Sequence, residues 1–210
     1  MPQPRSIVYV DGFNLYYGAV RGTAYKWLDL ARFFRLLRPN EDLRRVRYFT
    51  ALVDGPRRAN QEMYLRALST TPLVEVILGK FKPKRIKCQM PGCTHQGGRF
   101  FVTYEEKRTD VNIAVRMLDD AYQDHCDRLI LVSGDSDLVP AVATVRERFP
   151  QKKVTVYVPA KNPTRGAAVE LRTAANVDRA LPLNLLEKAQ FSAVLADTGG
   201  GSEIRKPAAW

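Results

Sequence analysis

The chain alternates short, almost continuously apolar runs with longer segments of helical period, and this alternation most constrains its fold. The apolar runs have the length of strands and fall at 7–10, 46–52, 73–78, 128–132 and 154–158. Helical patterns occupy 27–38, 56–69, a segment that begins at Thr109 and another that contains Pro140 in its first turn. Strands that alternate with helices form a parallel sheet covered on both faces. We therefore predict a three-layer α/β fold with a mainly parallel central sheet.

The length of the chain favours one main domain. A chain of 210 residues, 45% of them hydrophobic, buries roughly two thirds or more of its unfolded surface in a single core. We predict this domain over 1–181, with an insertion at about 80–104. A terminal helix is expected over 182–196, and the Gly-rich segment 197–210 is expected to be a flexible tail.

Compartment and partners follow from composition. No apolar run approaches the ~20 residues of a membrane span, the N-terminus lacks a signal-peptide pattern, and three cysteines do not suggest a secreted disulfide framework. We expect a cytoplasmic protein with no membrane partner and leave its oligomeric state open. The formal charge of +11 favours a polyanion such as nucleic acid, although a generally basic protein has the same signature.

Acidic residues follow two of the predicted strands. Asp11 ends the run 7–10, and the segment 133–137, Ser-Gly-Asp-Ser-Asp, ends the run 128–132. In an open parallel sheet the functional crevice lies beyond the carboxyl ends of the strands. A third acidic residue, Asp110, lies where a helix begins, with Thr109 or Asp110 as the expected N-cap. We expect all these carboxylates to face one crevice.

The joint acidic pattern predicts a metal site. Taken singly, Asp110 or Asp137 is explained by a cap or a turn. Four carboxylates that converge without a cation repel one another, so a bound Mg²⁺ or Mn²⁺ is the more economical account. The predicted ligands are Asp11, Asp110, Asp135 and Asp137. Ser133 is expected to order these ligands, and Asn14 is expected either to orient water or phosphate or to serve the loop structurally.

Three segments together resemble a known family. Val-Tyr-Val-Asp-Gly-Phe-Asn-Leu at 8–15, Glu-Lys-Arg-Thr-Asp-Val-Asn at 106–112 and Val-Ser-Gly-Asp-Ser-Asp-Leu at 132–138 resemble, in order, the signature blocks of NYN-domain proteins, especially the LabA-like group. The resemblance covers about residues 5–180. It implies a PIN-like, Rossmann-like nuclease fold, and it carries catalytic metal-site roles onto Asp11, Asp110, Asp135 and Asp137, with Asn14 beside them.

Other enzyme classes fit the sequence poorly. The Gly-Asp-Ser at 134–136 is reminiscent of certain esterases, but those need a histidine late in the chain, and this chain has only His95 and His125. A haloacid dehalogenase phosphatase needs an aspartate two residues after Asp11, where Phe13 stands. The chain has no Walker-type phosphate loop and no dinucleotide fingerprint.

The insertion is basic and aromatic. Aromatic residues at Phe81, Phe100, Phe101 and Tyr104 suit stacking on unpaired bases, unless they form the core face of a hairpin. We expect RNA contacts from Lys82, Lys84, Arg85, Lys87, Lys107 and Arg108. A structural Zn²⁺ site at Cys88, Cys93 and His95 is a further expectation, with free thiols in a loop as the alternative.

The sequence thus favours a metal-dependent endoribonuclease that acts on single-stranded or loop RNA. Two rival hypotheses stay open: a PIN-like module that binds RNA without cleaving it, and a nuclease that acts on DNA or flaps. The intact aspartate set favours cleavage, because a pure binder gains little from negative charge beside a polyanion.

Overall fold

The computed structural model describes residues 2–94, 100–160, 168–197 and 202–210, and its centre is a parallel sheet of six strands. The sheet order is β3-β2-β1-β6-β7-β8, and every pairing along it is parallel. The strands are β1 (Arg5–Asp11), β2 (Asp42–Thr50), β3 (Val74–Leu78), β6 (Arg128–Val132), β7 (Lys153–Val158) and β8 (Val177–Ala180). The predicted mainly parallel α/β fold is confirmed.

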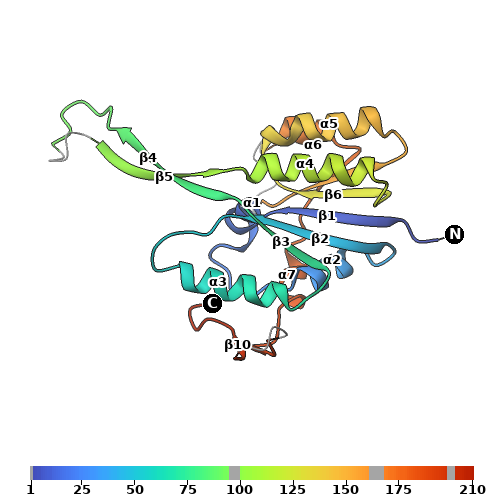
Figure 1. Cartoon of the computed structure of the whole chain (residues 1–210), viewed down its shortest axis with the longest axis horizontal. Coiled ribbons are helices and arrows are strands. Elements are labelled where there is room, and N and C mark those ends of the chain that lie inside the picture. Colours follow the sequence, from blue (N-terminus) through green and yellow to red (C-terminus); the bar gives the residue numbers. More distant parts are fainter. Residues whose placement is uncertain (1, 95–99, 161–167, 198–201) are drawn as a thin grey trace.

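Helices cover both faces of the sheet (Figure 1). On one side lie α2 (Leu30–Leu37), α3 (Arg58–Ser69) and α7 (Asn184–Lys188), and on the other α4 (Thr109–Tyr122), α5 (Val139–Arg148) and α6 (Val169–Ala174). Alternation along β1 explains the two cores: Val8 and Val10 pack with the first group of helices, and Ile7 and Tyr9 with the second. All four residues are almost fully buried, which is why the run reads as continuously apolar.

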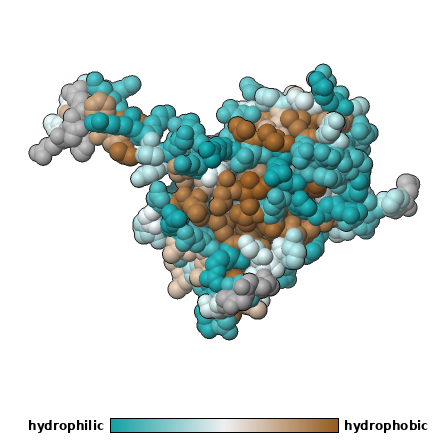
Figure 2. Space-filling model, viewed as in Figure 1, coloured by the Kyte–Doolittle hydropathy of each residue, from teal (hydrophilic) through white to brown (hydrophobic). Residues whose placement is uncertain are grey.

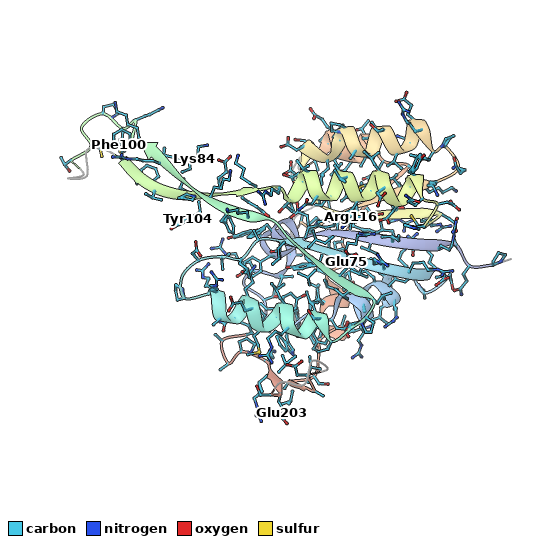
Figure 3. The ribbon with its side chains drawn as sticks, viewed as in Figure 1. Glu75, Lys84, Phe100, Tyr104, Arg116 and Glu203 are labelled. Carbon is cyan, nitrogen blue, oxygen red and sulfur yellow. The ribbon has the colours of Figure 1, made fainter. Side chains whose placement is uncertain are left out.

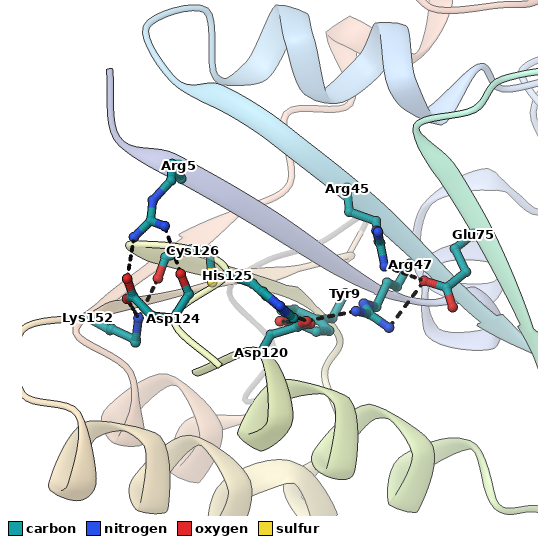
Figure 4. A network of polar contacts seen from close by, with 10 residues as sticks. All are labelled: Arg5, Tyr9, Arg45, Arg47, Glu75, Asp120, Asp124, His125, Cys126 and Lys152. Atoms are coloured by element: carbon teal, nitrogen blue, oxygen red, sulfur yellow. Dashed lines mark hydrogen bonds and ion pairs between the residues drawn. The ribbon is translucent and has the colours of Figure 1, made fainter. Parts of the chain in front are cut away.

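A buried ion pair links the sheet to α4 (Figure 4). The Arg47 guanidinium lies 2.8 Å from an Asp120 carboxylate oxygen, and these side chains are 3% and 0% exposed. The Tyr9 hydroxyl donates to the other Asp120 oxygen at 2.7 Å. Because Asp120 is fully partnered, its burial is compatible with a stable core.

The basic insertion forms a two-stranded antiparallel hairpin, β4 (Lys80–Lys87) and β5 (Phe100–Lys107). The hairpin extends from the body as an arm (Figure 1), and Figure 3 shows the side chains of Lys84, Phe100 and Tyr104 along it. Phe100, Phe101 and Tyr104 are 37%, 47% and 54% exposed. For these three residues the alternative of a buried hairpin face is therefore wrong.

The C-terminal segment differs from its prediction. The helix expected over 182–196 is only the short α7, followed by β9 (Val194–Leu195). The expected flexible tail instead pairs β10 (Ile204–Arg205) with β9. Ile204 is fully buried, and the Trp210 ring packs against Trp27 and Tyr64. Two apolar side chains thus hold the described part of this Gly-rich segment on the core.

The N-cap of α4 is Arg108, in the left-handed region at φ 80°, so the expectation of Thr109 or Asp110 is wrong. Figure 2 shows an apolar area on the face between α3 and α4. None of the helices that the structure describes is both long enough and apolar enough for a membrane crossing.

Candidate functional site

The candidate site lies at the carboxyl ends of β1 and β6, the two central neighbours in the sheet. The chain moves outward from β1 through β2 to β3 and then returns to β6 on the other side, so these strands flank the topological switch point. Val10 pairs with Val132, which places Asp11 beside Ser133. Parallel pairing therefore brings together two segments that lie 122 residues apart.

Hydrogen bonds fix the carboxylate of Asp11. One oxygen accepts from the backbone N–H of Asn14 at 2.9 Å, and the other accepts from the Asn14 side-chain amide at 2.6 Å and the Ser133 hydroxyl at 3.0 Å. The first of these contacts caps the short helix α1 (Gly12–Leu15). Asn14 also accepts from the backbone N–H of Gly134 at 3.1 Å. Asn14 and Ser133 thus connect the two strand ends.

The network continues into the acidic segment after β6. The Asp135 backbone N–H donates to the Ser133 hydroxyl at 3.1 Å. The Asp135 carboxylate caps the 3-10 helix η2 (Ser136–Leu138) by accepting from the Asp137 backbone N–H at 3.0 Å. Asp135 is half-buried and Asp137 is exposed. One Asp135 oxygen is therefore held by the turn, and the Asp137 side chain lies at the surface.

Asp110 lies in the first turn of α4, near the carboxylates of Asp11 and Asp135. Burial raises the pKa of Asp110 to about 6, with further contributions from the negative charges of Asp135, Asp11 and Asp137. The pKa of Asp11 is also raised, chiefly by burial, although its hydrogen bonds oppose the rise. The charges of Asp11, Asp135 and Asp137 thus act on the Asp110 carboxyl, and the charge of Asp135 acts on Asp11.

A fifth carboxylate, Glu106, joins the cluster and was not singled out from the sequence. Burial and the nearby charges of Asp11 and Asp110 raise the pKa of Glu106 to about 7, although a hydrogen bond from Thr109 opposes the rise. Glu106 lies near the end of β5, where the hairpin returns to the body. Its only sequence signal is its place four residues before Asp110 in the middle block.

Tyr48 packs closely against the first turn after β1. A Cβ added to Gly12 would lie 2.8 Å from the Tyr48 hydroxyl and 2.7 Å from the Phe49 carbonyl oxygen. Glycine is therefore required at position 12 for this close approach. Burial and the charge of Asp11 raise the pKa of Tyr48, so its hydroxyl stays protonated beside the carboxylates.

The donor set suits a hard divalent cation. All five side chains of the carboxylate cluster offer oxygen, the ligand atom that Mg²⁺ and Mn²⁺ prefer. In the described chain, no Lys or Arg forms an ion pair with any of the five. In their present positions, however, no three His, Cys, Asp or Glu side chains of the described residues are arranged to hold a metal ion. Metal binding by the cluster would therefore require these side chains to move from the positions seen here.

The expected RNA-binding cations divide into two groups. Lys84 and Lys107 form ion pairs with Glu105 at 3.4 and 2.8 Å. Arg85 lies over the Phe100 ring at 4.3 Å. Within the described residues no carboxylate partner is found for Lys82, Arg85, Lys87 or Arg108.

The suggested zinc ligands remain a prediction. Cys88 and Cys93 are free, half-buried thiols, and His95 lies outside the described residues. Cys126 is fully buried in the core beneath α4 and α5.

Comparisons with known proteins give one curated relative and one informative structure. The chain is 30% identical over 198 residues to 6-hydroxy-3-succinoylpyridine 3-monooxygenase HspA of Pseudomonas putida, an alignment that covers 80% of this chain and 63% of that relative. A crystal structure of a protein of unknown function from Vibrio parahaemolyticus matches with a TM-score of 0.54 and 24% identity, over 86% of this chain and 94% of that one. The structural likeness supports the fold alone.

The family is settled by a domain model. The model of the NYN domain matches residues 5–181, a range that contains the whole six-stranded sheet and all five carboxylates of the cluster. The chain therefore belongs to the NYN domain family, within the PIN-like nuclease superfamily.

Proposed function

We propose that this protein is a divalent-metal-dependent endoribonuclease. The observation that carries the proposal is the cluster of Asp11, Glu106, Asp110, Asp135 and Asp137 at the switch point of a PIN-like sheet. Burying like charges together without a counter-charge destabilises the fold. A protein retains such an arrangement at a cost in stability when the site has a function.

Asp11, Asp110, Asp135 and Asp137 would hold the ion directly or through water. A bound Mg²⁺ or Mn²⁺ neutralises phosphate charge and lowers the pKa of bound water. The protein's part is to position the ligands: Ser133 and Asn14 hold Asp11 and join it to the Asp135 turn. Removal of either support would leave the carboxylates in place but poorly oriented.

The hairpin arm supports RNA as the substrate. Those of its cations that have no carboxylate partner among the described residues attract phosphates, and its exposed aromatic rings offer stacking surfaces for unpaired bases. β5 leads directly from this surface to Glu106 and Asp110. A strand bound along the arm would therefore pass toward the cluster.

The direct test is cleavage of one labelled sequence prepared as single-stranded RNA and as DNA, each with Mg²⁺, Mn²⁺ or EDTA. We expect internal cuts in RNA that require metal and disappear in Asp135→Asn, because an amide oxygen is a weaker, uncharged ligand. Asp119→Asn is the matched control, since Asp119 lies on α4 outside the cluster. Cleavage of DNA alone would assign the enzyme to DNA, and binding of RNA without any cleavage would favour the non-catalytic module.

A second candidate function is oxygenation of an aromatic compound. The curated relative is named for a 3-monooxygenase reaction on a pyridine, and this chain spans about two thirds of that relative's length, 63%. A cavity lined by aromatic residues lies directly beside Gly12. Such a reaction places one atom of O₂ on the ring and reduces the other to water, so it consumes two electrons from an added donor.

Oxygen uptake tests this second candidate. The assay contains the protein, 6-hydroxy-3-succinoylpyridine, and NADH or a reduced flavin. Substrate-dependent uptake with loss of the pyridine would favour oxygenation. Absence of uptake together with metal-dependent RNA cleavage would leave the nuclease as the function.

A further inference from the structure

A cavity of about 140 Å³ lies beside the carboxylate cluster. Residues of α1, the π-helix η1 (Tyr16–Val20), the end of β2 and α3 line it, together with the C-terminal residue of the described chain. Six lining side chains are aromatic: Phe13, Tyr16, Tyr17, Tyr48, Tyr64 and Trp210. Walls of this kind favour a flat ring, which stacks on one face and meets ring edges on the others.

The size of the cavity suits a single six-membered ring. An engineered cavity of about 150 Å³ in another protein binds one benzene molecule, and the cavity here is close to that size, about 140 Å³. A pyrimidine or a pyridine would fill this space. The fused rings of a purine would extend through its open side into solvent.

The wall formed by η1 is held in an uncommon conformation. The π-helix carries Tyr16, Tyr17 and Val20, all of which line the cavity. Within this helix, Gly18 packs closely against Pro159, because an added Cβ would lie 1.7 Å from the Pro159 carbonyl oxygen. Short π-helical turns are rare and occur frequently at functional sites. The contact with Pro159 anchors η1 and thereby fixes the tyrosine wall.

Two cations in the lining favour an anionic ligand. Lys26 and Arg57 both line the cavity, and among the described residues neither has a carboxylate within ion-pair distance. The Lys26 ammonium donates to the Ala209 carbonyl oxygen at 3.4 Å. An aromatic pocket with two available cations matches a ring that bears a negative group.

We infer that this cavity binds a single planar six-membered ring that carries an anionic substituent, either as a pyrimidine nucleotide or as a free aromatic carboxylate. If the ligand is a pyrimidine nucleotide, the inference rests on the proposed nuclease function. Tyr48 lines the cavity and also lies near Asp11, so a base held there would lie beside the carboxylate cluster. If the ligand is a free aromatic carboxylate, the inference is independent of RNA cleavage.

Binding is measured without any cleavage, so its failure is distinguishable from failure of the nuclease proposal. The chain has two tryptophans. Trp210 lines the cavity, and the Trp27 ring lies 6.1 Å from the Trp210 ring between centroids. Tryptophan fluorescence therefore reports whether the cavity is occupied. The titrants are UMP, CMP, AMP, uridine and nicotinate, in EDTA, with calorimetry as a second readout. We expect UMP and CMP, or nicotinate, to bind at least tenfold more tightly than AMP.

Three variants test the assigned contacts. Val53→Phe, in the loop before α3, fills part of the cavity and should abolish ligand binding. Tyr17→Ala removes an exposed part of the cavity wall and should weaken ligand binding. Tyr122→Ala is the control for the latter, because Tyr122 is 78% exposed and lies outside the cavity. Arg57→Gln should weaken UMP binding by about twofold to fivefold and leave uridine unchanged. Arg116→Gln, an exposed arginine on α4, is its control.

Each outcome decides between the alternatives. Preference for UMP and CMP assigns the cavity to a nucleotide, and preference for nicotinate assigns it to a free aromatic acid. Equal binding of AMP would overturn the preference for a single ring. No binding of UMP, CMP or nicotinate at millimolar concentration, or binding unchanged in both Val53→Phe and Tyr17→Ala, would overturn the inference.

Discussion

Asp110→Asn should make the metal-free protein more stable at neutral pH, although it removes a side chain of the proposed site. The folded protein raises the pKa of Asp110 to about 6, above the ~3.9 of an exposed aspartate. A raised carboxyl pKa means that folding favours the protonated form. Below about pH 4 the Asp110 carboxyl is protonated in both the folded and the unfolded state, so it does not lower the stability of the fold. As the pH rises from about 4 to about 6 the folded protein loses stability relative to the unfolded chain, and above about pH 6 the loss is complete.

The magnitude follows from the same values. A pKa difference of about two pH units corresponds to about 3 kcal/mol. Asp110 is only half-buried, and screening by solvent reduces this to about half, about 1.5 kcal/mol. Asparagine loses about 0.5 kcal/mol of favourable interaction with the N-terminus of α4. The expected net gain is about 1 kcal/mol, or about 2–4 °C in melting temperature for a chain of this size.

Thermal melts in EDTA at pH 4.5 and pH 8 test this reasoning. Asp110→Asn should melt close to the wild-type protein at pH 4.5 and above it at pH 8. Asp119→Asn, on the same helix but outside the cluster, should show no such gain between the two pH values. If Asp110→Asn melts below the wild-type protein at pH 8, the folded protein does not raise the pKa of Asp110 as described.

Three further outcomes are expected. Asp120→Ala removes the shorter of the two ion pairs of the buried Arg47 and the acceptor of the Tyr9 hydroxyl, and leaves Arg47 only Glu75 at 3.2 Å. It should lower the free energy of unfolding by about 3–5 kcal/mol in urea titrations; a loss below 1 kcal/mol would contradict the pairing. Gly12→Ala places a methyl against Tyr48 and should cost about 1–3 kcal/mol by thermal melting, whereas an unchanged melting temperature would show that the contact is loose. The last variant replaces four arm residues, Lys82, Lys84, Arg85 and Lys87, with alanine. Its RNA affinity, measured in Ca²⁺, should fall less steeply with salt: the slope of log affinity against log salt should decrease by roughly 0.7 per lost phosphate contact. An unchanged slope would place the arm away from RNA.

The strands and the main acidic residues were predictable from the sequence because each depends on a local pattern. The run 128–132 matches β6 in both bounds, since strands buried on both faces are apolar throughout. Asp11 and Asp135 follow from the general rule that parallel sheets carry their sites at the carboxyl ends of strands. The rule requires no knowledge of the intervening helices.

The remaining features depend on contacts between distant segments. Glu106 joins the cluster only because the hairpin returns to the body at that residue, and no local pattern specifies where an arm rejoins a fold. The Gly-rich composition of the C-terminal segment suggested a flexible tail, but Ile204 and Trp210 outweigh it by burying apolar surface. The aromatic cavity likewise combines side chains from segments far apart in the chain.

The central claim is that the carboxylate cluster binds a divalent ion, and direct Mn²⁺ binding tests it most directly. Electron paramagnetic resonance measures free Mn²⁺ during a titration of the wild-type protein, Asp135→Asn and Asp119→Asn. We expect saturable binding to the wild-type protein and to Asp119→Asn, with affinity lowered at least tenfold in Asp135→Asn. Equal affinity of the wild-type protein and Asp135→Asn, or no binding to the wild-type protein, would contradict the claim.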